Sequence, residues 1–265
     1  KNKWKIIRRS KMRSPLQINT SKSTGILKKL IPKGSSVSSF FFYDGTVEVP
    51  LASSDRIVVA HTNKYPVFEF WKYMTTQPKI LSSFADFLHE RLTVPELYLL
   101  QDNWFSKEDG ETRSALFYIL NRCSESGYAS CGNINKEKLT SSNIKTLKRL
   151  KIKNLYPFYD KVEDPTDGFK TATDTDFLLL PLGKYDHNFF DYGKSIGNDM
   201  VLIDHRKIRE TVEQIDRKWV IVYMNHPAIF KLYKDKNITM IDKYGNKTNK
   251  KERCGEIIIN NFVSI

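Results

Sequence analysis

The chain has 265 residues, of which 40% are hydrophobic and 12% aromatic, enough for a packed core, so a disordered chain is excluded. No apolar run reaches membrane-spanning length, and we therefore expect no membrane partner. The formal net charge of +13 favours polyanionic partners such as DNA or RNA, although solubility alone would also account for it.

The three cysteines, Cys123, Cys131 and Cys254, are an odd number without C-x-x-C spacing, and the five histidines show no H-E-x-x-H pattern. This argues against a disulfide framework and a zinc site and suits a reducing compartment. We therefore expect an intracellular protein of the cytoplasm or the mitochondrial matrix. Because the sequence begins at Lys1 rather than Met, we also expect residues upstream of it.

The N-terminal region is strongly basic, because residues 1–43 contain no Asp or Glu. Seven of the first thirteen residues are cations: Lys1, Lys3, Lys5, Arg8, Arg9, Lys11 and Arg13. We interpret residues 1–13 as a basic arm that binds nucleic acid. The end of an organelle-targeting region, which is also Arg-rich and acid-poor, and a plain solvated terminus are the alternatives.

Seven runs predict strands, and helical patterns separate most of them. The strands are expected at Ser35–Tyr43, Arg56–Thr62, Asn154–Tyr159, Asp176–Leu182, Trp219–Met224, Asn237–Tyr244 and Glu256–Val263. The helices are expected at Gly25–Leu30, Tyr65–Thr75, Ile80–Leu92, Glu111–Asn121, Asn143–Leu150 and His205–Asp216. Strands that alternate with helices indicate a parallel sheet with right-handed crossovers.

The last two strands are joined by Gly245–Arg253, a polar connection rich in Gly and Lys that suits an antiparallel hairpin. Seven strands that end in a hairpin describe the methyltransferase variant of the Rossmann-like fold. We therefore predict an α/β protein with a seven-stranded mixed sheet. Its expected organisation is the basic arm 1–13 and a domain at 14–265, with a mainly helical insertion at about 84–150.

The stretch Thr175–Tyr185 is typical of a buried central strand that a Pro and a Gly bring to an end. In open α/β sheets the loop after such a strand holds ligands and catalytic groups. Here the tip, Leu180–Lys184, carries no carboxylate, amide, hydroxyl, thiol or imidazole. The scaffold is typical of an enzyme, whereas the position where a catalytic side chain is expected carries none.

A second basic cluster extends from residue 145 to 153, where Leu147, Leu150 and Ile152 are expected to face the core. The cations expected to face outward are Lys145, Lys148, Arg149, Lys151 and Lys153. Charge on a helix face usually serves solvation alone. Given the overall positive charge, we predict that this face contacts phosphates.

Short motifs along nearly the whole chain occur in a recognisable order. They are Ser14-Pro15-Leu16, Lys22, Ile26–Pro32, Asn121-Arg122, Ser126-Gly127, Leu139–Leu150, Tyr192-Gly193-Lys194, Asp204-His205, Trp219–Asn225 with Pro227, Leu232–Asp235 and Glu256–Asn260. This series resembles the Dam-type (adenine-specific) DNA methyltransferases. Each motif is weak alone, but their order indicates the same fold and common descent.

The positions that the resemblance assigns to the cofactor S-adenosylmethionine differ in this sequence. The family's glycine loop F-x-G-x-G corresponds to Phe40–Val47, where only Gly45 remains, and side chains at the other positions would crowd the cofactor. The family's P-G-G-K segment corresponds to Asn19–Lys22, with only the lysine retained. The ribose-binding acid corresponds to His61. We therefore expect no cofactor.

The catalytic motif of the family, D-P-P-Y, is also missing. Its Asp accepts hydrogen bonds from the adenine amino group and its Tyr stacks on the flipped base. The Asp aligns with Leu180 or Pro181, which cannot accept a hydrogen bond. Tyr185 or Asp186 would reach this position only through a shift away from the strand tip. The resemblance therefore implies no catalytic residue.

Two remaining histidines have weaker functional interpretations. His226 follows a strand end near the position where the family binds its substrate, and we interpret it as structural. Asp199, Asp204 and His205 could suggest metal ligands, but their spacing is generic and we predict no metal site.

These observations predict a catalytically inactive adenine-methyltransferase homologue that serves as a nucleic-acid-associated structural subunit. RNA and DNA are both compatible with the argument, and protein partners in a larger assembly are expected, for example in a large ribonucleoprotein such as a mitochondrial ribosome. The alternatives are a pseudo-subunit that partners an active DNA adenine methyltransferase, an active divergent adenine-specific DNA methyltransferase, and a protein-only interaction module.

Overall fold

The computed structural model describes residues 13–16, 21–172, 174–185 and 203–262. Seven strands form one sheet in the order β3-β2-β1-β4-β5-β7-β6. They are β1 (Ser36–Ser39), β2 (Ile57–Thr62), β3 (Leu155–Tyr159), β4 (Phe177–Gly183), β5 (Lys218–Met224), β6 (Asn237–Asp242) and β7 (Cys254–Asn260). β7 pairs antiparallel with β5 and β6, and the remaining pairs are parallel.

This sheet confirms the predicted fold class, a Rossmann-like methyltransferase fold with a seven-stranded mixed sheet. Each predicted strand is present, β4 lies centrally between β1 and β5, and the final two strands pair as an antiparallel hairpin. The prediction that the first strand continues to Tyr43 was wrong. β1 ends at Ser39 because Phe41 has a φ of 60°, a left-handed conformation that an extended strand cannot contain.

The helices of the described part include three that the sequence analysis did not predict. The α-helices are α1 (Thr24–Leu30), α2 (Glu48–Ala52), α3 (Tyr65–Thr76), α4 (Pro78–Arg91), α5 (Val94–Asn103), α6 (Gly110–Cys123), α7 (Ser141–Thr146), α8 (His205–Glu213) and α9 (Pro227–Leu232). The 3₁₀ helices are η1 (Trp104–Ser106), η2 (Lys136–Lys138), η3 (Leu147–Arg149), η4 (Pro165–Gly168) and η6 (Lys251–Arg253). The unpredicted α-helices are α2, α5 and α9, of which α2 and α9 are too short to show a helical period.

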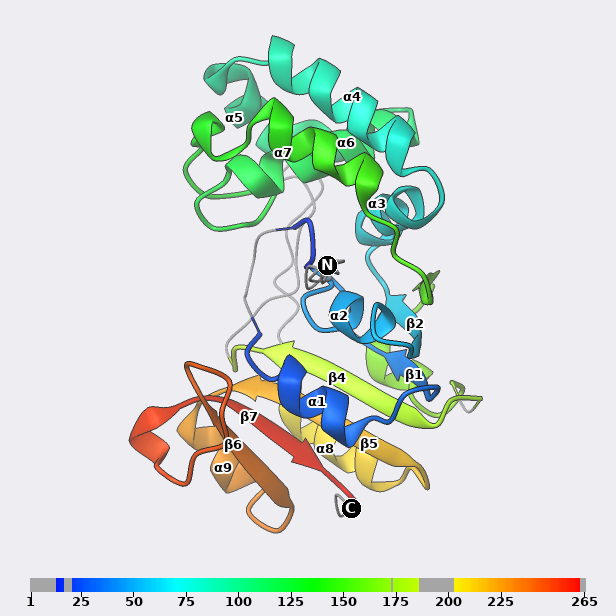
Figure 1. The fold of residues 1–265 in the computed structure, drawn as a ribbon, viewed down its shortest axis with the longest axis vertical. Coiled ribbons are helices and arrows are strands. Elements are labelled where there is room, and N and C mark those ends of the chain that lie inside the picture. The colour runs from blue at the N-terminus through cyan, green and yellow to red at the C-terminus, as the bar shows by residue number, and fades with distance from the viewer. Residues whose placement is uncertain (1–12, 17–20, 173, 186–202, 263–265) are drawn as a thin grey trace, which may run out of the picture.

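Two hydrophobic cores lie on opposite faces of the sheet. Leu179 belongs to the core that includes α1–α7, whereas its neighbours Leu178 and Leu180 belong to the core of α8 and α9. Successive strand residues point to opposite faces, so this alternation shows that β4 is buried on both sides. In Figure 1, α8 and α9 accompany the sheet in the lower half, and the helices α3–α7 form the upper part.

The connection between β2 and β3 contains every helix from α3 to η3, residues 65–149. The predicted insertion at 84–150 therefore begins inside α4, and its boundaries remain a prediction. Of the predicted arm 1–13, only Arg13 lies within the described residues, and it is exposed. None of the described helices combines the length and the apolarity that crossing a membrane requires.

Candidate functional site

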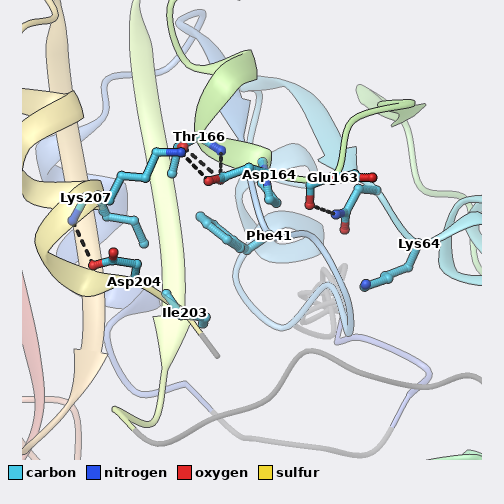
Figure 2. Close-up of a pocket in the computed structure, with 11 residues that line it drawn as sticks. Phe41, Lys64, Glu163, Asp164, Thr166, Ile203, Asp204 and Lys207 are labelled. Atoms are coloured by element: carbon cyan, nitrogen blue, oxygen red, sulfur yellow. Dashed lines mark hydrogen bonds and ion pairs between the residues drawn. The ribbon is translucent and has the colours of Figure 1, made fainter. Parts of the chain in front are cut away.

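A cavity of about 210 Å³ lies where the carboxyl ends of the parallel strands meet (Figure 2). β1 and β4 are neighbours there, and the chain continues from them toward opposite edges of the sheet, which is the usual position of a ligand crevice. The cavity is lined by Phe41, Asn63, Lys64, residues 163–166, Ile203, Asp204, Lys207 and Ile208. Its volume is below the roughly 300–1,000 Å³ typical of small-molecule pockets.

Three of the polar residues that line this cavity, Asp164, Thr166 and Lys207, bind one another. Asp164 accepts hydrogen bonds from the Thr166 amide at 2.8 Å and the Thr166 hydroxyl at 2.7 Å, and it forms a salt bridge with Lys207. Partial burial raises the pKa of Asp164, but these hydrogen bonds outweigh burial and leave the pKa below its ordinary value. Asp204 caps α8 by accepting from the amides of Arg206 and Lys207, each at 3.0 Å. These contacts fasten η4 to α8.

The tip of β4, where the resemblance places the catalytic Asp, is apolar. Leu180 and Leu182 are fully buried. A register shift between Pro181 and Gly183 marks the end of the strand, and Gly183 has a φ of 64°. The side chains of Leu180 and Leu182 therefore pack into the core, whereas Lys184 is exposed.

Tyr185 stacks on two imidazoles just beyond this tip. The ring centroids lie 4.5 Å from His205 and 4.4 Å from His226, with interplanar angles of 18° and 4°. His205 Nε2 donates to the Tyr185 carbonyl at 2.7 Å, so its Nδ1 accepts from the Tyr223 hydroxyl at 2.9 Å. His226 Nδ1 accepts from the Ala228 amide and caps α9, consistent with a structural role.

The sequence analysis named both histidines separately but missed their stack with Tyr185, because the three rings come from separate segments of the chain. No signal in the sequence joins them. Among the described residues, no group of three His, Cys, Asp or Glu side chains is placed to hold a metal ion. Asp199 and Asp186 lie outside the described residues.

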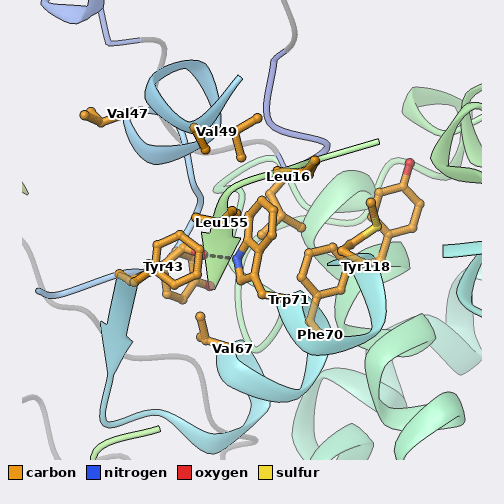
Figure 3. Close-up of a cluster of buried hydrophobic side chains, with 14 of the residues drawn as sticks. Leu16, Tyr43, Val47, Val49, Val67, Phe70, Trp71, Tyr118 and Leu155 are labelled. Carbon is orange, nitrogen blue, oxygen red and sulfur yellow. Dashed lines mark hydrogen bonds between the residues drawn. The ribbon is translucent and has the colours of Figure 1, made fainter. Parts of the chain in front are cut away.

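The retained glycine of the glycine loop packs against Trp71, whose indole Figure 3 shows within a cluster of buried side chains. Gly45 has a φ of 68°, and a Cβ atom at this position would lie 2.6 Å from the Trp71 ring. The Trp71 indole N–H donates to the Tyr43 carbonyl at 2.7 Å. The absence of a side chain at Gly45 therefore makes room for the buried Trp71 indole.

The end of β2 is covered in a similar way. Phe40, of which 1% is exposed, stacks on His61 with a centroid distance of 4.3 Å and an interplanar angle of 10°. Nδ1 of His61 lies 3.1 Å from Oδ2 of Asp160, which follows β3. The position that the resemblance assigns to the ribose-binding acid is thus covered by a ring and paired within the chain.

The start of α1 is bound by Glu256 of β7. The Glu256 carboxylate accepts hydrogen bonds from the amide of Lys22 at 2.5 Å, the amide of Ser23 at 2.9 Å and the hydroxyl of Ser21 at 2.9 Å. Lys22 is the residue retained from the family's cofactor segment. The amides of Lys22 and Ser23 therefore bind a carboxylate of the protein itself.

S-adenosylmethionine does not fit the residues present at these three positions. Trp71 packs on the glycine loop, Phe40 stacks on His61, and the Glu256 carboxylate accepts hydrogen bonds from the amides at the start of α1. A bound cofactor would have to displace buried side chains and a carboxylate that has three donors, and each displacement costs free energy.

The second basic cluster lies on the surface as predicted. Leu147 and Ile152 are buried and Leu150 packs against the core, whereas all five cations are exposed. We call Lys145, Lys148, Arg149, Lys151 and Lys153 the basic face. Lys145 forms a salt bridge of 3.1 Å with Asp86, and within the described part of the chain no ion pair engages the other four. Lys1, Lys3, Lys5, Arg8, Arg9 and Lys11 lie outside the described residues.

The strand order defines a methyltransferase-like fold, and solved methyltransferases show distant similarity to it. A SAM-dependent methyltransferase from Aquifex aeolicus has 8% identity and a TM-score of 0.38, over 92% of this chain and 90% of that one. One from Agrobacterium tumefaciens has 9% identity and a TM-score of 0.36, over 89% and 59%. A type I restriction-modification system methyltransferase subunit from Streptococcus thermophilus has 8% identity and a TM-score of 0.35, over 94% and 45%.

No protein-family model and no curated protein matches the sequence. The chain spans 59% and 45% of the second and third of these structures. At 8–9% identity such similarities concern the fold at most and give no information about activity.

Proposed function

We propose that the protein is a catalytically inactive homologue of the adenine-specific DNA methyltransferases that acts as a nucleic-acid-associated structural subunit. The observation that carries this proposal is that the three positions which the resemblance assigns to the cofactor contact Trp71, Phe40 and Glu256 of the protein itself. The apolar tip of β4 and the imidazoles already stacked on Tyr185 support it further. A target base would find no acceptor at Leu180 and would compete with His205 and His226 for the tyrosine ring.

The basic face supports the association with nucleic acid. Four exposed cations without an ion pair in the described part of the chain, on a chain with a net charge of +13, are suited to phosphate contacts. Function resides in sites rather than in the fold, so a protein that keeps the fold without catalytic residues is expected to function through its surface. We place this surface in a larger assembly with protein partners, such as a large ribonucleoprotein.

We predict no measurable binding of S-adenosylmethionine in isothermal titration of the purified chain, because a cofactor would have to displace Phe40 and the Glu256 carboxylate. The variant His61→Asp restores the acid and should remain without binding, since Phe40 still covers the site. Micromolar affinity of the unaltered chain would contradict the proposed inactivity and favour an active, divergent adenine methyltransferase.

We predict that the native protein copurifies with nucleic acid and that its affinity for oligonucleotides falls steeply between about 50 and 200 mM salt. Phosphate contacts release counterions, and this release produces the salt dependence. The composition of the copurified material separates the alternatives. Ribosomal RNA with ribosomal proteins supports the ribonucleoprotein, whereas a catalytic methyltransferase indicates a pseudo-subunit. Absence of binding at the low-salt end would reject the nucleic-acid role.

A further inference from the structure

In the described part of the chain, helices cover only one face of the outer strands β2 and β3. Val58, Ala60 and Leu155 of these strands belong to the core that includes α2 and α3. The connection from β3 to β4 contains only the 3₁₀ helix η4 in its described part, and Phe169 after η4 packs on Phe40 beyond β1. The other face of β2 and β3 therefore has no helix over it among the described residues.

Two aromatic side chains of β3 stand on this uncovered face. Tyr156 is 55% exposed and Phe158 is 52% exposed, and they lie two residues apart on the same side of the strand. Their partners in register on β2 are Val59 and His61, and the Phe158 ring lies 5.2 Å from the His61 ring. We call Tyr156 and Phe158 the aromatic pair. The Phe158 ring contacts His61, and about half of each side chain of the pair remains accessible.

Cations flank the aromatic pair along the chain. Residues 145–161 contain the basic face and Lys161, all exposed, and a single acid, Asp160, whose carboxylate faces His61. Lys151 and Lys153 directly precede the strand. The chain before the pair is therefore strongly positive and complementary to a polyanion, whereas the acids Glu163 and Asp164 follow Lys161 on the other side.

The outer edge of β3 is unsuited to a protein strand. The Asp160 amide donates inward to Thr62, so by alternation the nitrogen of Pro157 lies at the outer edge. Because proline has no N–H to donate, a strand that paired with this edge would lack one backbone hydrogen bond at Pro157. This surface has accessible aromatic rings and cations beside them, and its edge lacks a backbone donor. These features favour the binding of nucleic acid over pairing with a further protein strand.

We propose that this face binds single-stranded nucleic acid, with unpaired bases stacking on Tyr156 and Phe158 and phosphates contacting Lys151, Lys153 and Lys161. Aromatic side chains on an open sheet face stack bases of any sequence, and adjacent cations bind the phosphates. A duplex keeps its bases stacked inside and cannot use the rings. The inference rests on the proposed nucleic-acid association and specifies its ligand and its site.

The test measures fluorescence anisotropy of labelled oligo(U) and oligo(dT) of about 15 nucleotides at roughly 50 mM salt. Tyr156→Ala and Phe158→Ala should each weaken binding by roughly 5- to 150-fold, the range for loss of one base–aromatic stack. Tyr156→Phe and Phe158→Tyr keep a ring and should bind as the unaltered chain does. The control Tyr244→Ala removes a ring that is 75% exposed between β6 and β7 and should have no effect.

Ultraviolet crosslinking of the unaltered chain gives a second readout, independent of the stability of the variants. Trypsin cuts after Lys153 and Lys161, and the released peptide 154–161 should carry the nucleotide adduct. Oligonucleotide binding that is unchanged by both alanine variants, an adduct only on other peptides, or tighter binding to a duplex of the same length would overturn the aromatic site and leave the proposed function standing.

No binding of any oligonucleotide by the unaltered chain would overturn both proposals. Loss of self-association or of a copurifying protein in the alanine variants, with oligonucleotide binding intact, would show that the face is a protein interface and would also overturn the inference.

Discussion

Replacing Lys148, Arg149, Lys151 and Lys153 together by Gln is expected to weaken oligonucleotide binding by on the order of 100- to 1,000-fold near 0.1 M salt, if each contacts one phosphate. The slope of log affinity against log salt should become shallower by roughly 3, because about 0.7 counterions are released per phosphate of a single strand. The four side chains are exposed, so the fold should not change. Anisotropy titrations at several salt concentrations measure both quantities.

The matched control changes the same charge elsewhere. Lys243, Lys247, Lys250 and Lys251 are exposed in the connection between β6 and β7, at the opposite end of the molecule from α7 (Figure 1). Their replacement by Gln also removes four positive charges. If both quadruple variants lose affinity equally, net charge alone accounts for the binding and the basic face has no special role. If only the first variant loses affinity, the basic face is the contact surface.

Most strands could be predicted from the sequence because they contain a short apolar run bounded by polar or turn residues, although β1, with the sequence SVSS, does not. The run around Leu178–Leu180 reads as a strand buried on both faces, and the structure places it there. The helix α5 could also have been found, since Thr93 and Glu96 form a capping box whose T-x-x-E pattern is visible in the sequence. The short helices α2 and α9 could not, because tertiary packing stabilises them rather than a period.

The absence of family motifs was visible in the sequence, but the contacts that the protein's own side chains make at those positions were not. Glu256 lies far along the chain from Ser21–Ser23, and only the pairing of β7 beside β5 brings its carboxylate to α1. The contact of Trp71 with Gly45 likewise depends on how α3 packs. The accessibility of Tyr156 and Phe158 arises because none of the described helices covers that face of β3, and local periodicity in the sequence does not reveal this.

A buried carboxyl that the sequence analysis missed should make the protein less stable as the pH rises. Glu48, at the start of α2, is 2% exposed, and its carboxylate accepts a hydrogen bond from the Ser39 hydroxyl at 2.7 Å. Burial raises the pKa of Glu48 to about 7. The hydrogen bond from Ser39 opposes this shift, and the negative charge of Asp44 adds to it. In the unfolded chain the carboxyl titrates near its ordinary value of 4.5.

The folded state therefore binds the proton more tightly than the unfolded state. The contribution of this group to the free energy of unfolding is fully present below about pH 4.5 and falls as the pH rises through about 7. The difference between the two pKa values corresponds to about 3 kcal/mol. Glu48→Gln keeps the shape and an acceptor for Ser39 but cannot ionise, so it should be more stable than the unaltered chain at pH 8 by up to that amount.

Urea denaturation at pH 5 and pH 8 measures this difference. The advantage of Glu48→Gln should be large at pH 8 and small at pH 5, because in acid the folded protein already holds a neutral carboxyl. Glu210→Gln, which changes an exposed carboxylate on α8, is the control and should alter neither value appreciably. An equal effect of Glu48→Gln at both pH values would mean that packing, and not ionisation, determines the change. A loss of stability at pH 8 would show that the ionised carboxylate is stabilised by groups other than Ser39.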